Sequence, residues 1–290
     1  MDDSCVKGIL IPIGGNEDKG SRNELEEAYS FDFVGDGILS HVVKQAGGLE
    51  AKIVVIPAAS SIPEEVAQNY IDAFEKLGCT NIHILHILKK EDSENPINIE
   101  LIQSANAVMF SGGNQSKITK KMLGTTIHRV MLDKFINEPF VIAGTSAGAM
   151  VMSHQMIAGG TNKDSFRKGV VDMGKGLGFI PELIIDSHFI RRGRFGRLTE
   201  AVAKFPDLIG VGLAEDTGII IRNKREFQVI GSGMAIVFDL REATHNYHEI
   251  LEFNTPMTVV GMKTHVLSNG DRFEIDTRTI KVLPMNEAFV

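Results

Sequence analysis

The 290-residue sequence predicts an α/β fold, with a doubly wound, mostly parallel sheet flanked by helices and a β-rich C-terminal part. Short apolar segments alternate with helix-like segments in the first half of the chain, which is typical of βαβ units. Three apolar segments end in glycine-rich turns, at residues 14–15, 112–113 and 144–148. The carboxyl ends of parallel strands meet at one edge of a sheet, so we expect these turns to lie together at a ligand site.

The first half of the chain is expected to supply the parallel sheet and its helices. The predicted strands are short apolar runs at residues 8–13, 52–58, 81–85, 107–110 and 140–143. The predicted helices occupy residues 35–47, 63–77, 98–104, 117–122 and 126–137. The second helix has clear ends, because Pro63 and two glutamates follow a serine cap and Gly78 comes after its last turn. The polar residues 20–32 are expected to form an exposed loop.

The chain changes character at about residue 214, where helix-like patterns give way to short strands and turns. The predicted strands lie at residues 218–222, 226–230, 234–239 and 257–267. This β-rich part either extends the main sheet or packs on it as an antiparallel layer. No linker rich in proline or serine separates it from the rest, so residues 1–290 are expected to form a single domain.

Composition and charge exclude several classes of function. The net charge of −7 argues against a nucleic-acid partner, which selects for basic surfaces. No apolar run reaches the roughly 18 residues of a membrane span, and the N-terminus lacks the basic start and apolar core of a signal peptide. Cys5 and Cys79 have no metal-ligand spacing, so they are expected to be free thiols in a reducing compartment. A cytoplasmic protein without a bound metal is therefore predicted.

Residues 139–152, PFVIAGTSAGAMVM, carry the pattern most typical of catalysis. A short apolar strand leads into G-T-S-A-G at residues 144–148, a G-x-S-x-G motif with Ser146 at its centre. A serine at a sharp turn between strand and helix exposes its hydroxyl, and the N–H groups of the helix favour a negative oxygen there. Ser146 is therefore the candidate nucleophile, and a structural glycine-rich turn is the alternative. The helix is expected to extend past His154.

A serine nucleophile needs a base, and His188 is the candidate. Of the nine histidines, it is the one that follows an apolar run, residues 183–185, between an acid and a cluster of arginines. A carboxylate is also expected to orient the imidazole ring. The carboxylates between serine and histidine are Asp164, Asp172, Glu182 and Asp186.

Asp164 is the preferred carboxylate, because it lies in a loop that is free to reach the ring. It also produces the order serine, acid, histidine of other enzymes with this elbow. Asp186 is too near along its strand to face the ring of His188. Glu215 and Asp216 follow another apparent strand and are further candidates.

Four arginines follow the histidine within seven residues, at positions 191, 192, 194 and 197. A solvated basic helix face is the ordinary interpretation of such a cluster. Beside a candidate base in an acidic protein, it also predicts a pocket for carboxylates, because guanidinium groups pair with carboxylates through two parallel hydrogen bonds.

These motifs together resemble the serine peptidase family of cyanophycinases and aspartyl dipeptidases. The resemblance rests on GGNEDK (residues 14–19), SGGNQ (111–115), GTSAGA (144–149), MGKGLGF (173–179) and DSHFIRRGRFGRL (186–198), and it covers roughly residues 8–240. The arginine-rich run is uncommon in the dipeptidases, so the similarity favours the cyanophycinases. It implies a fold like that of class I glutamine amidotransferases.

The resemblance also implies a role for each matching residue. The implied catalytic residues are Ser146 as nucleophile, His188 as base and Asp164 as acid. The implied oxyanion hole consists of the N–H groups of Gly113 and Ala147. The implied substrate site comprises Gln115, Asp186, Ser187, Arg192, Arg194 and Arg197. The sequence departs from the family twice: a glutamate is more usual as the acid, and a glutamine usually occupies the position of Ser187.

The implied reaction is cleavage of cyanophycin, a polyaspartate with arginine on each β-carboxyl group, into β-aspartyl-arginine dipeptides. It proceeds through an acyl-enzyme and needs no cofactor. Family resemblance also indicates a homodimer. Three alternatives remain: a cytoplasmic aspartyl or isoaspartyl dipeptidase, a non-catalytic binding protein with an amidotransferase-like fold, and, less favoured, an esterase of the α/β-hydrolase type. The third lacks a His-Gly-Gly-Gly segment.

Overall fold

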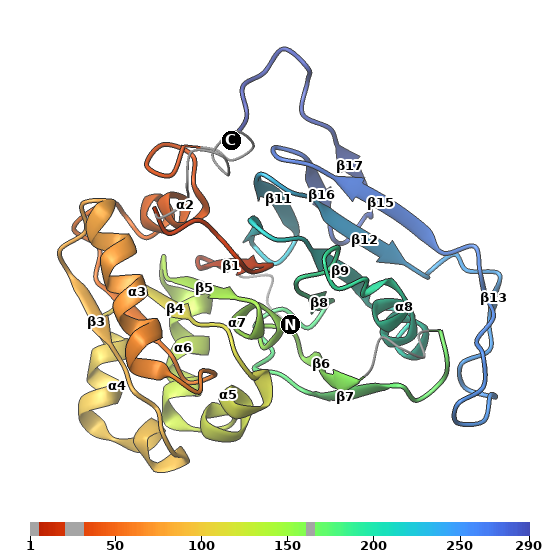
Figure 1. Ribbon diagram of the computed structural model, residues 1–290, viewed down its shortest axis with the longest axis horizontal. Helices are drawn as coiled ribbons and strands as arrows, with labels where there is room; N and C mark the ends of the chain where they lie inside the picture. Colours follow the sequence, from red (N-terminus) through yellow and green to blue (C-terminus); the bar gives the residue numbers. More distant parts are fainter. Residues whose placement is uncertain (1–5, 21–31, 161–165) are drawn as a thin grey trace.

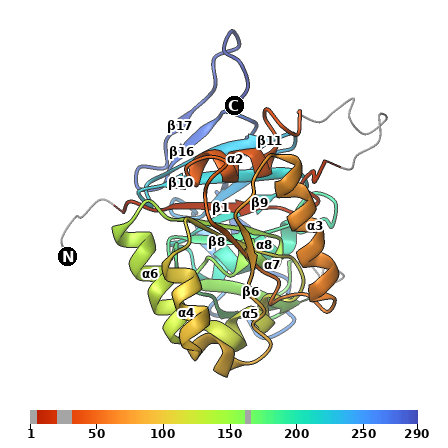
Figure 2. The ribbon, with the colours of Figure 1, turned by 90° about the vertical axis from the view of Figure 1, so that its left-hand side faces the viewer.

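A computed structural model describes residues 6–20, 32–160 and 166–290 of the chain (Figures 1 and 2). Cys5, Asp164 and most of the predicted loop at residues 20–32 lie outside these ranges. Within the described part of the chain, no helix is long and apolar enough to cross a membrane. In those same ranges Cys79 is a free, buried thiol.

The predicted parallel sheet is confirmed as the core of a larger nine-stranded sheet. Five parallel strands lie side by side in the order β1, β5, β4, β2, β3. They are β1 (Ile9–Ile13), β2 (Ile53–Ile56), β3 (Ile82–Ile84), β4 (Ala107–Phe110) and β5 (Val141–Thr145). Beyond β1 the sheet continues with antiparallel strands from the C-terminal part: β10 (Thr217–Arg222), β11 (Glu226–Gly231), β16 (Arg272–Glu274) and β17 (Ile280–Lys281).

Helices cover both faces of this sheet, and Figure 2 shows α3 on the opposite side from α4 and α6. One face carries α2 (Ile38–Gln45) and α3 (Pro63–Lys76), and the other carries α4 (Pro96–Gln103), α5 (Gln115–Met122) and α6 (Thr126–Asn137). A 3₁₀ turn, η1 (Lys90–Glu94), precedes α4. Successive strand residues point to opposite faces, so Leu10 and Val54 enter one core while Ile11 and Val55 enter the other.

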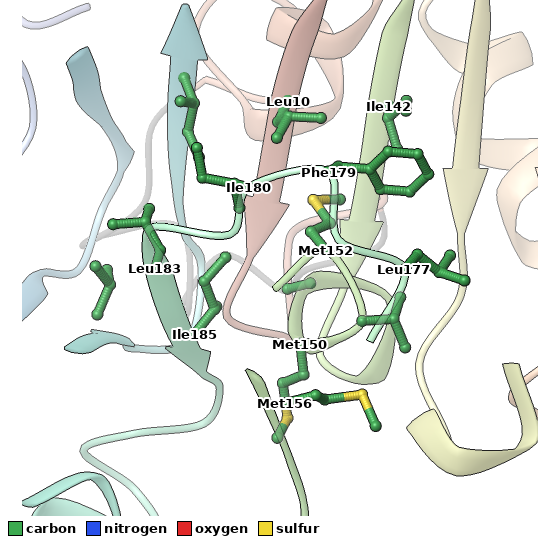
Figure 3. Packing of buried hydrophobic residues seen from close by; sticks show 14 of the residues in the cluster. Leu10, Ile142, Met150, Met152, Met156, Leu177, Phe179, Ile180, Leu183 and Ile185 are labelled. Atoms are coloured by element: carbon green, nitrogen blue, oxygen red, sulfur yellow. The ribbon is translucent and has the colours of Figure 1, made fainter. Parts of the chain in front are cut away.

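The β-rich part therefore extends the main sheet, and two of its strands also pair with two earlier strands in a second, mixed sheet. This sheet has the order β15, β12, β9, β8 and packs against α8 (Phe195–Lys204). Its strands are β8 (Leu183–Asp186), β9 (Ile209–Leu213), β12 (Ala235–Asp239) and β15 (Lys263–Leu267). Side chains from β1, β5 and β8 meet the methionines after the elbow in one continuous core (Figure 3).

Two predicted elements are shorter than the sequence indicated. The elbow helix α7 (Ala147–Met150) has a single turn. The backbone N–H groups of Leu177 and Ile180 donate to the carbonyls of Val151 and Met152, where a longer helix would place its own hydrogen bonds. His154 therefore follows the helix, and the chain enters a hairpin of β6 (Gln155–Gly160) and β7 (Val171–Lys175). The predicted strand at residues 257–267 is interrupted at Gly261, where φ is +81°. It divides into β15 and the short β14 (Val259–Val260), which pairs with β13 (His245–Asn246).

Candidate active site

The loop that leaves β1 holds three segments of the site together through successive carbonyl groups. The carbonyls of residues 13, 14 and 15 accept hydrogen bonds from the backbone N–H groups of Ser146, His188 and Asp216, each at 2.8 Å. These three donors come from β5, from the end of β8 and from the turn between β9 and β10. The glycine-rich turn after β1 therefore sets the relative positions of the candidate nucleophile and base.

The backbone of Ser146 has the strained geometry of a nucleophile elbow. Its φ of 51° and ψ of −106° lie outside the regions that a residue with a β-carbon prefers. The flanking glycines permit this turn because they lie against neighbouring backbone: a β-carbon on Gly144 would lie 2.6 Å from Gly148, and one on Gly148 would lie 2.6 Å from the carbonyl oxygen of Phe110. Close packing of the backbone, as well as the geometry of the turn, therefore requires glycine at both positions of the motif.

The elbow opens into a cavity of about 410 Å³ at the carboxyl ends of the strands. Glycine-rich turns after β1 and β4 form part of its wall, together with the elbow itself, as the strand order predicts. The lining residues are Gly15, Asn16, Glu17, Lys19, Val66, Asn69, Tyr70, Gly112, Gly113, Thr145, Ser146, His188 and Arg192. Ser146 and His188 therefore face the same space.

The imidazole of His188 is oriented by Glu215. Its Nδ1–H donates to Glu215 Oε1 at 3.1 Å, which leaves Nε2 as the nitrogen that can accept a proton. The other neighbouring carboxylate, Asp216, accepts instead from the backbone N–H of Asp18 and from the hydroxyl of Ser232. Asp164 lies outside the described residues, so Glu215 is the carboxylate that the described part of the chain places against the ring.

Burial lowers the pKa of His188 below its ordinary value, Glu215 opposes this effect, and the nearby charge of Arg192 adds to it. A lowered pKa keeps the ring neutral, and able to accept a proton, at neutral pH. We expect the acidic limb of kcat/KM against pH to have its midpoint below 6.5, the ordinary histidine value. Replacing Arg192 with glutamine removes a cation and should move this midpoint to higher pH.

Arg191→Gln is the matched control for that shift, because its exposed side chain is not among the groups that influence His188. A pH–rate profile for the three proteins measures the effect. An unchanged midpoint in Arg192→Gln, or an equal shift in both variants, would contradict the electrostatic account.

Gly15 lies directly against the His188 ring. A β-carbon at this position would lie 2.3 Å from Cε1 and 2.6 Å from Nε2 of the imidazole, and its φ is +117°. Gly15→Ala is therefore expected to displace the ring and lower kcat by roughly 100-fold, the effect of a misplacement of about 1 Å in a catalytic group.

Gly47→Ala provides the control for backbone strain, since Gly47 also has a positive φ, +108°, but its β-carbon would have no neighbour within 4 Å. Steady-state kinetics and thermal unfolding of both variants test the prediction. Equal losses of activity in the two variants would show that strain, and not the contact with His188, is responsible.

Two backbone N–H groups are available where the family resemblance expects an oxyanion hole. Ala147 is the first residue of α7, and Gly113 lines the cavity with a φ of +140°. Within the described part of the chain, neither N–H is recorded with a hydrogen-bond acceptor. First-turn N–H groups of a helix have no partner inside it, so Ala147 can donate to a substrate oxygen.

Asp186, Arg194 and Arg197 form a buried ion cluster, which differs from their expected place around the substrate. Asp186 is fully buried and accepts from Arg194 Nη1 at 3.0 Å and from Arg197 Nε at 2.9 Å. Burial lowers the pKa of Arg194 to about 10, with Asp186 opposing the effect, so its charge persists at neutral pH. The cluster holds β8 against the start of α8. Of the three predicted substrate arginines, Arg192 lines the cavity.

The described residues that line the cavity do not include Ser187 or Gln115, which both have contacts within the protein. The hydroxyl of Ser187 is 3.3 Å from that of Ser146 and 3.4 Å from the sulfur of Met150, and the residue is fully buried. Gln115 donates from its amide to the carbonyls of residues 157 and 158, so it supports β6. The Ser187 hydroxyl and the Gln115 amide, which the family resemblance assigned to substrate binding, thus have partners within the protein.

Glu17, to which no sequence motif assigned a role, lies at the cavity wall. Its buried carboxylate accepts from Lys19 at 2.8 Å, Tyr70 at 2.7 Å and Thr145 at 2.6 Å. Burial by itself would raise the pKa of Glu17, but Lys19 and the hydrogen bonds from Thr145 and Tyr70 lower it below its ordinary value. The GGNEDK segment was the available signal, but its partners lie in α3 and β5, far along the chain.

Comparisons with known proteins identify relatives over most of the chain. A profile described as Peptidase family S51 matches residues 35–229. A protein from Trichormus variabilis named cyanophycinase is 36% identical over 276 residues, which is 95% of this chain and 88% of the relative. A cyanophycinase from Geminocystis herdmanii is 30% identical over 272 residues, 94% of this chain and 95% of the relative.

A solved structure shares the fold. It is a peptidase from an acI-B1 Actinobacterium, which covers 92% of this chain and 98% of its own with a TM-score of 0.58 and 21% identity. At that identity the likeness concerns the fold alone.

Proposed function

The chain belongs to peptidase family S51 and is a serine peptidase, and we propose that it hydrolyses cyanophycin from a chain end to β-aspartyl-arginine dipeptides. The observation that carries the proposal is the single cavity that holds Ser146 at a strained elbow beside His188, whose ring is bonded to Glu215. The substrate itself is inferred from the relatives, which bear the name cyanophycinase.

Each catalytic group receives a role in this proposal. Ser146 is the nucleophile, His188 is the general base, and Glu215 holds the imidazole in the tautomer that leaves Nε2 free. Glu215 takes the role that the sequence assigned to Asp164, because its carboxylate accepts from the His188 ring and the family resemblance favours a glutamate as the acid. The N–H groups of Ala147 and Gly113 stabilise the oxyanion.

The reaction proceeds in two halves. Ser146 Oγ attacks the peptide carbonyl carbon while His188 Nε2 takes the hydroxyl proton. The tetrahedral intermediate collapses, the C–N bond breaks, and His188 returns the proton to the leaving amine. Water then attacks the acyl-enzyme and loses a proton to His188. The ester C–O bond breaks, His188 returns the proton to Ser146 Oγ, and the acid product leaves.

The free site differs from the reacting geometry at one point. In the described part of the chain the recorded hydrogen bond of the Ser146 hydroxyl is with Ser187, at 3.3 Å. Catalytic hydrogen bonds are often long before substrate binds. We propose that the Ser146 hydroxyl turns from Ser187 to His188 when a substrate carbonyl occupies the oxyanion hole.

A comparison of substrates tests the function. The purified protein is incubated with cyanophycin and, separately, with α- and β-aspartyl dipeptides, and products are identified by mass spectrometry. We expect β-aspartyl-arginine from the polymer and little turnover of the dipeptides. Turnover of dipeptides without release from the polymer would instead establish the aspartyl dipeptidase alternative.

The dipeptidase remains the second candidate because of Ser187, which is shorter than the glutamine of the family. Its hydroxyl lies near Ser146, Met150 and the guanidinium group of Arg194. A shorter side chain beside the nucleophile changes the shape of the site and can change which substrate it prefers.

We also propose that the protein acts in the cytoplasm as a homodimer that binds neither nucleic acid nor membrane. The support is the acidic net charge of −7 and the family resemblance. Light scattering after size-exclusion chromatography would test the dimer, and a mass equal to that of one chain would contradict it.

A further inference from the structure

Lys19 lies inside the candidate active site, although the catalytic proposal gives it no role. Its ammonium group is 2.8 Å from Glu17 Oε1 and 5.0 Å from the centre of the Tyr70 ring. Glu17 is in turn fixed by hydrogen bonds from Tyr70 and Thr145, so the cation is anchored to both α3 and the elbow strand. A lysine held in this way has a defined position on the cavity wall.

The ammonium group retains hydrogen-bonding capacity toward the cavity. It carries three N–H groups, and in the described ranges its recorded hydrogen-bond acceptor is Glu17. The side chain of Lys19 is 27% exposed, whereas that of Glu17 is 1% exposed. The carboxylate is therefore buried, whereas the more exposed lysine belongs to the wall of the cavity that Ser146 also lines.

The charged residues of the cavity wall favour an anionic ligand. Lys19 and Arg192 contribute two positive charges and Glu17 one negative charge, so with neutral His188 the wall has a net charge of +1. The whole chain carries −7. A locally positive cavity attracts carboxylates, while the net negative charge of the rest of the protein repels large acidic molecules.

The two cations line the cavity from different segments of the chain. Arg192 follows His188 by one turn, and its backbone N–H donates to the backbone carbonyl of His188. Lys19 lies over Tyr70 on the α3 side, where Val66 and Asn69 belong to the same helix face. His188 must return its proton to the leaving amine, so we assign the leaving half of a substrate to the side of His188 and Arg192, and the acyl half to the side of Tyr70 and Lys19.

We propose that Lys19 binds a free carboxylate on the acyl half of the substrate, an inference that rests on the proposed function. In cyanophycin each aspartate carries an arginine through its β-carboxyl group, so the carboxylate of that arginine is free. The acyl half of a scissile bond thus presents one carboxylate on a flexible arm. Lys19 is a subsite residue that selects this group, and Glu17 and Tyr70 are its positioning residues.

The test uses a two-unit oligomer of β-aspartyl-arginine in three forms. One form has all its carboxylates free, the second has the arginine carboxylate of the first unit as an amide, and the third has the terminal carboxylate as an amide. For the wild-type protein we expect kcat/KM to fall by roughly 10- to 100-fold on amidation of the first unit, the effect of losing a hydrogen bond to a charged group. In Lys19→Met this discrimination should disappear, and in Lys19→Arg it should largely return.

Three controls keep structural effects apart from recognition. Lys281→Met removes an exposed lysine on β17, far along the sheet, and should leave all three rates unchanged. The double variant Glu17→Gln/Lys19→Met removes both charges, so no buried carboxylate is left without its cation. If Lys19 acts on substrate, discrimination between free and amidated first units is weaker but present in Glu17→Gln, where Lys19 has lost its positioning partner, and is absent in the double variant.

Binding to the inactive Ser146→Ala protein supplies a second readout. Calorimetric titration with the same three oligomers should show the first-unit carboxylate preference with Lys19 and lose it in the Ser146→Ala/Lys19→Met protein. Equal losses on all three oligomers in Lys19→Met, or a loss that follows the terminal carboxylate, would overturn the inference. Failure of wild-type protein to cleave any oligomer would instead contradict the proposed function.

Discussion

Replacing Ser146 with alanine is expected to lower the hydrolysis of cyanophycin by roughly 10⁴-fold or more, because no acyl-enzyme can then form. The fold should persist, since the serine side chain has one recorded hydrogen bond, to Ser187, within the described residues. Release of soluble dipeptides from the polymer measures the loss, and circular dichroism checks the fold. Labelling by a serine-directed fluorophosphonate should disappear together with activity.

Ser116→Ala is the matched control for this substitution. Ser116 lies exposed in the first turn of α5 and does not line the cavity of the described structure. Its variant should retain activity and labelling. If Ser146→Ala kept normal hydrolysis of the polymer, the chain would use another nucleophile, and the binding-protein alternative would gain support if the wild-type protein also resisted the probe.

Replacing Glu215 with glutamine is expected to give the second-largest loss, roughly 10²- to 10⁴-fold in kcat. Glutamine has nearly the same shape but lacks the negative charge that stabilises the imidazolium formed during attack. Because Glu215 raises the pKa of His188 against the effect of burial, its loss should also move the acidic limb of the pH profile to lower pH. A merely structural role would not move that midpoint.

Asp164→Asn and Asp216→Asn are the comparisons that decide which carboxylate orients His188. Asp216 accepts hydrogen bonds from Asp18 and Ser232. Asp216→Asn should therefore lower the thermal stability of the protein and leave the midpoint of the pH–rate profile unchanged. Asp164→Asn should leave kcat within a fewfold of wild type if Glu215 is the acid. A large loss in Asp164→Asn with little loss in Glu215→Gln would restore the first prediction.

Much of the fold was predictable because local patterns report it directly. The alternation of apolar strands and amphipathic helices predicted the parallel core from β1 to β5, and the strand order confirms it. This prediction succeeded because the periodicity of apolar side chains is a local property of each segment. The elbow helix was overestimated for a related reason. Ala-Met-Val-Met is compatible with a helix, and only hydrogen bonds from residues 177 and 180 end it after one turn.

The arginine cluster shows the limit of local reasoning about a site. Spacing predicted that the arginines share a helix face, and charge made carboxylates their expected partners. Arg194 lies immediately before α8, and Arg197 lies in its first turn. The partner is Asp186 of the same chain, because a fully buried carboxylate must be paired with cations when it leaves water. The sequence indicates that the arginines pair with carboxylates, but only the tertiary structure identifies the buried carboxylate with which they pair.

By itself, the sequence determined the class of fold, the candidate nucleophile at Ser146 and the candidate base at His188, since each belongs to a short motif with its own local chemistry. Only the tertiary structure decided that Glu215 faces the histidine, that Glu17 is bonded to Thr145 across 128 positions, and that Lys19 enters the same cavity. These pairings depend on how strands are ordered and how side chains are buried, and neither is encoded within a few neighbouring residues.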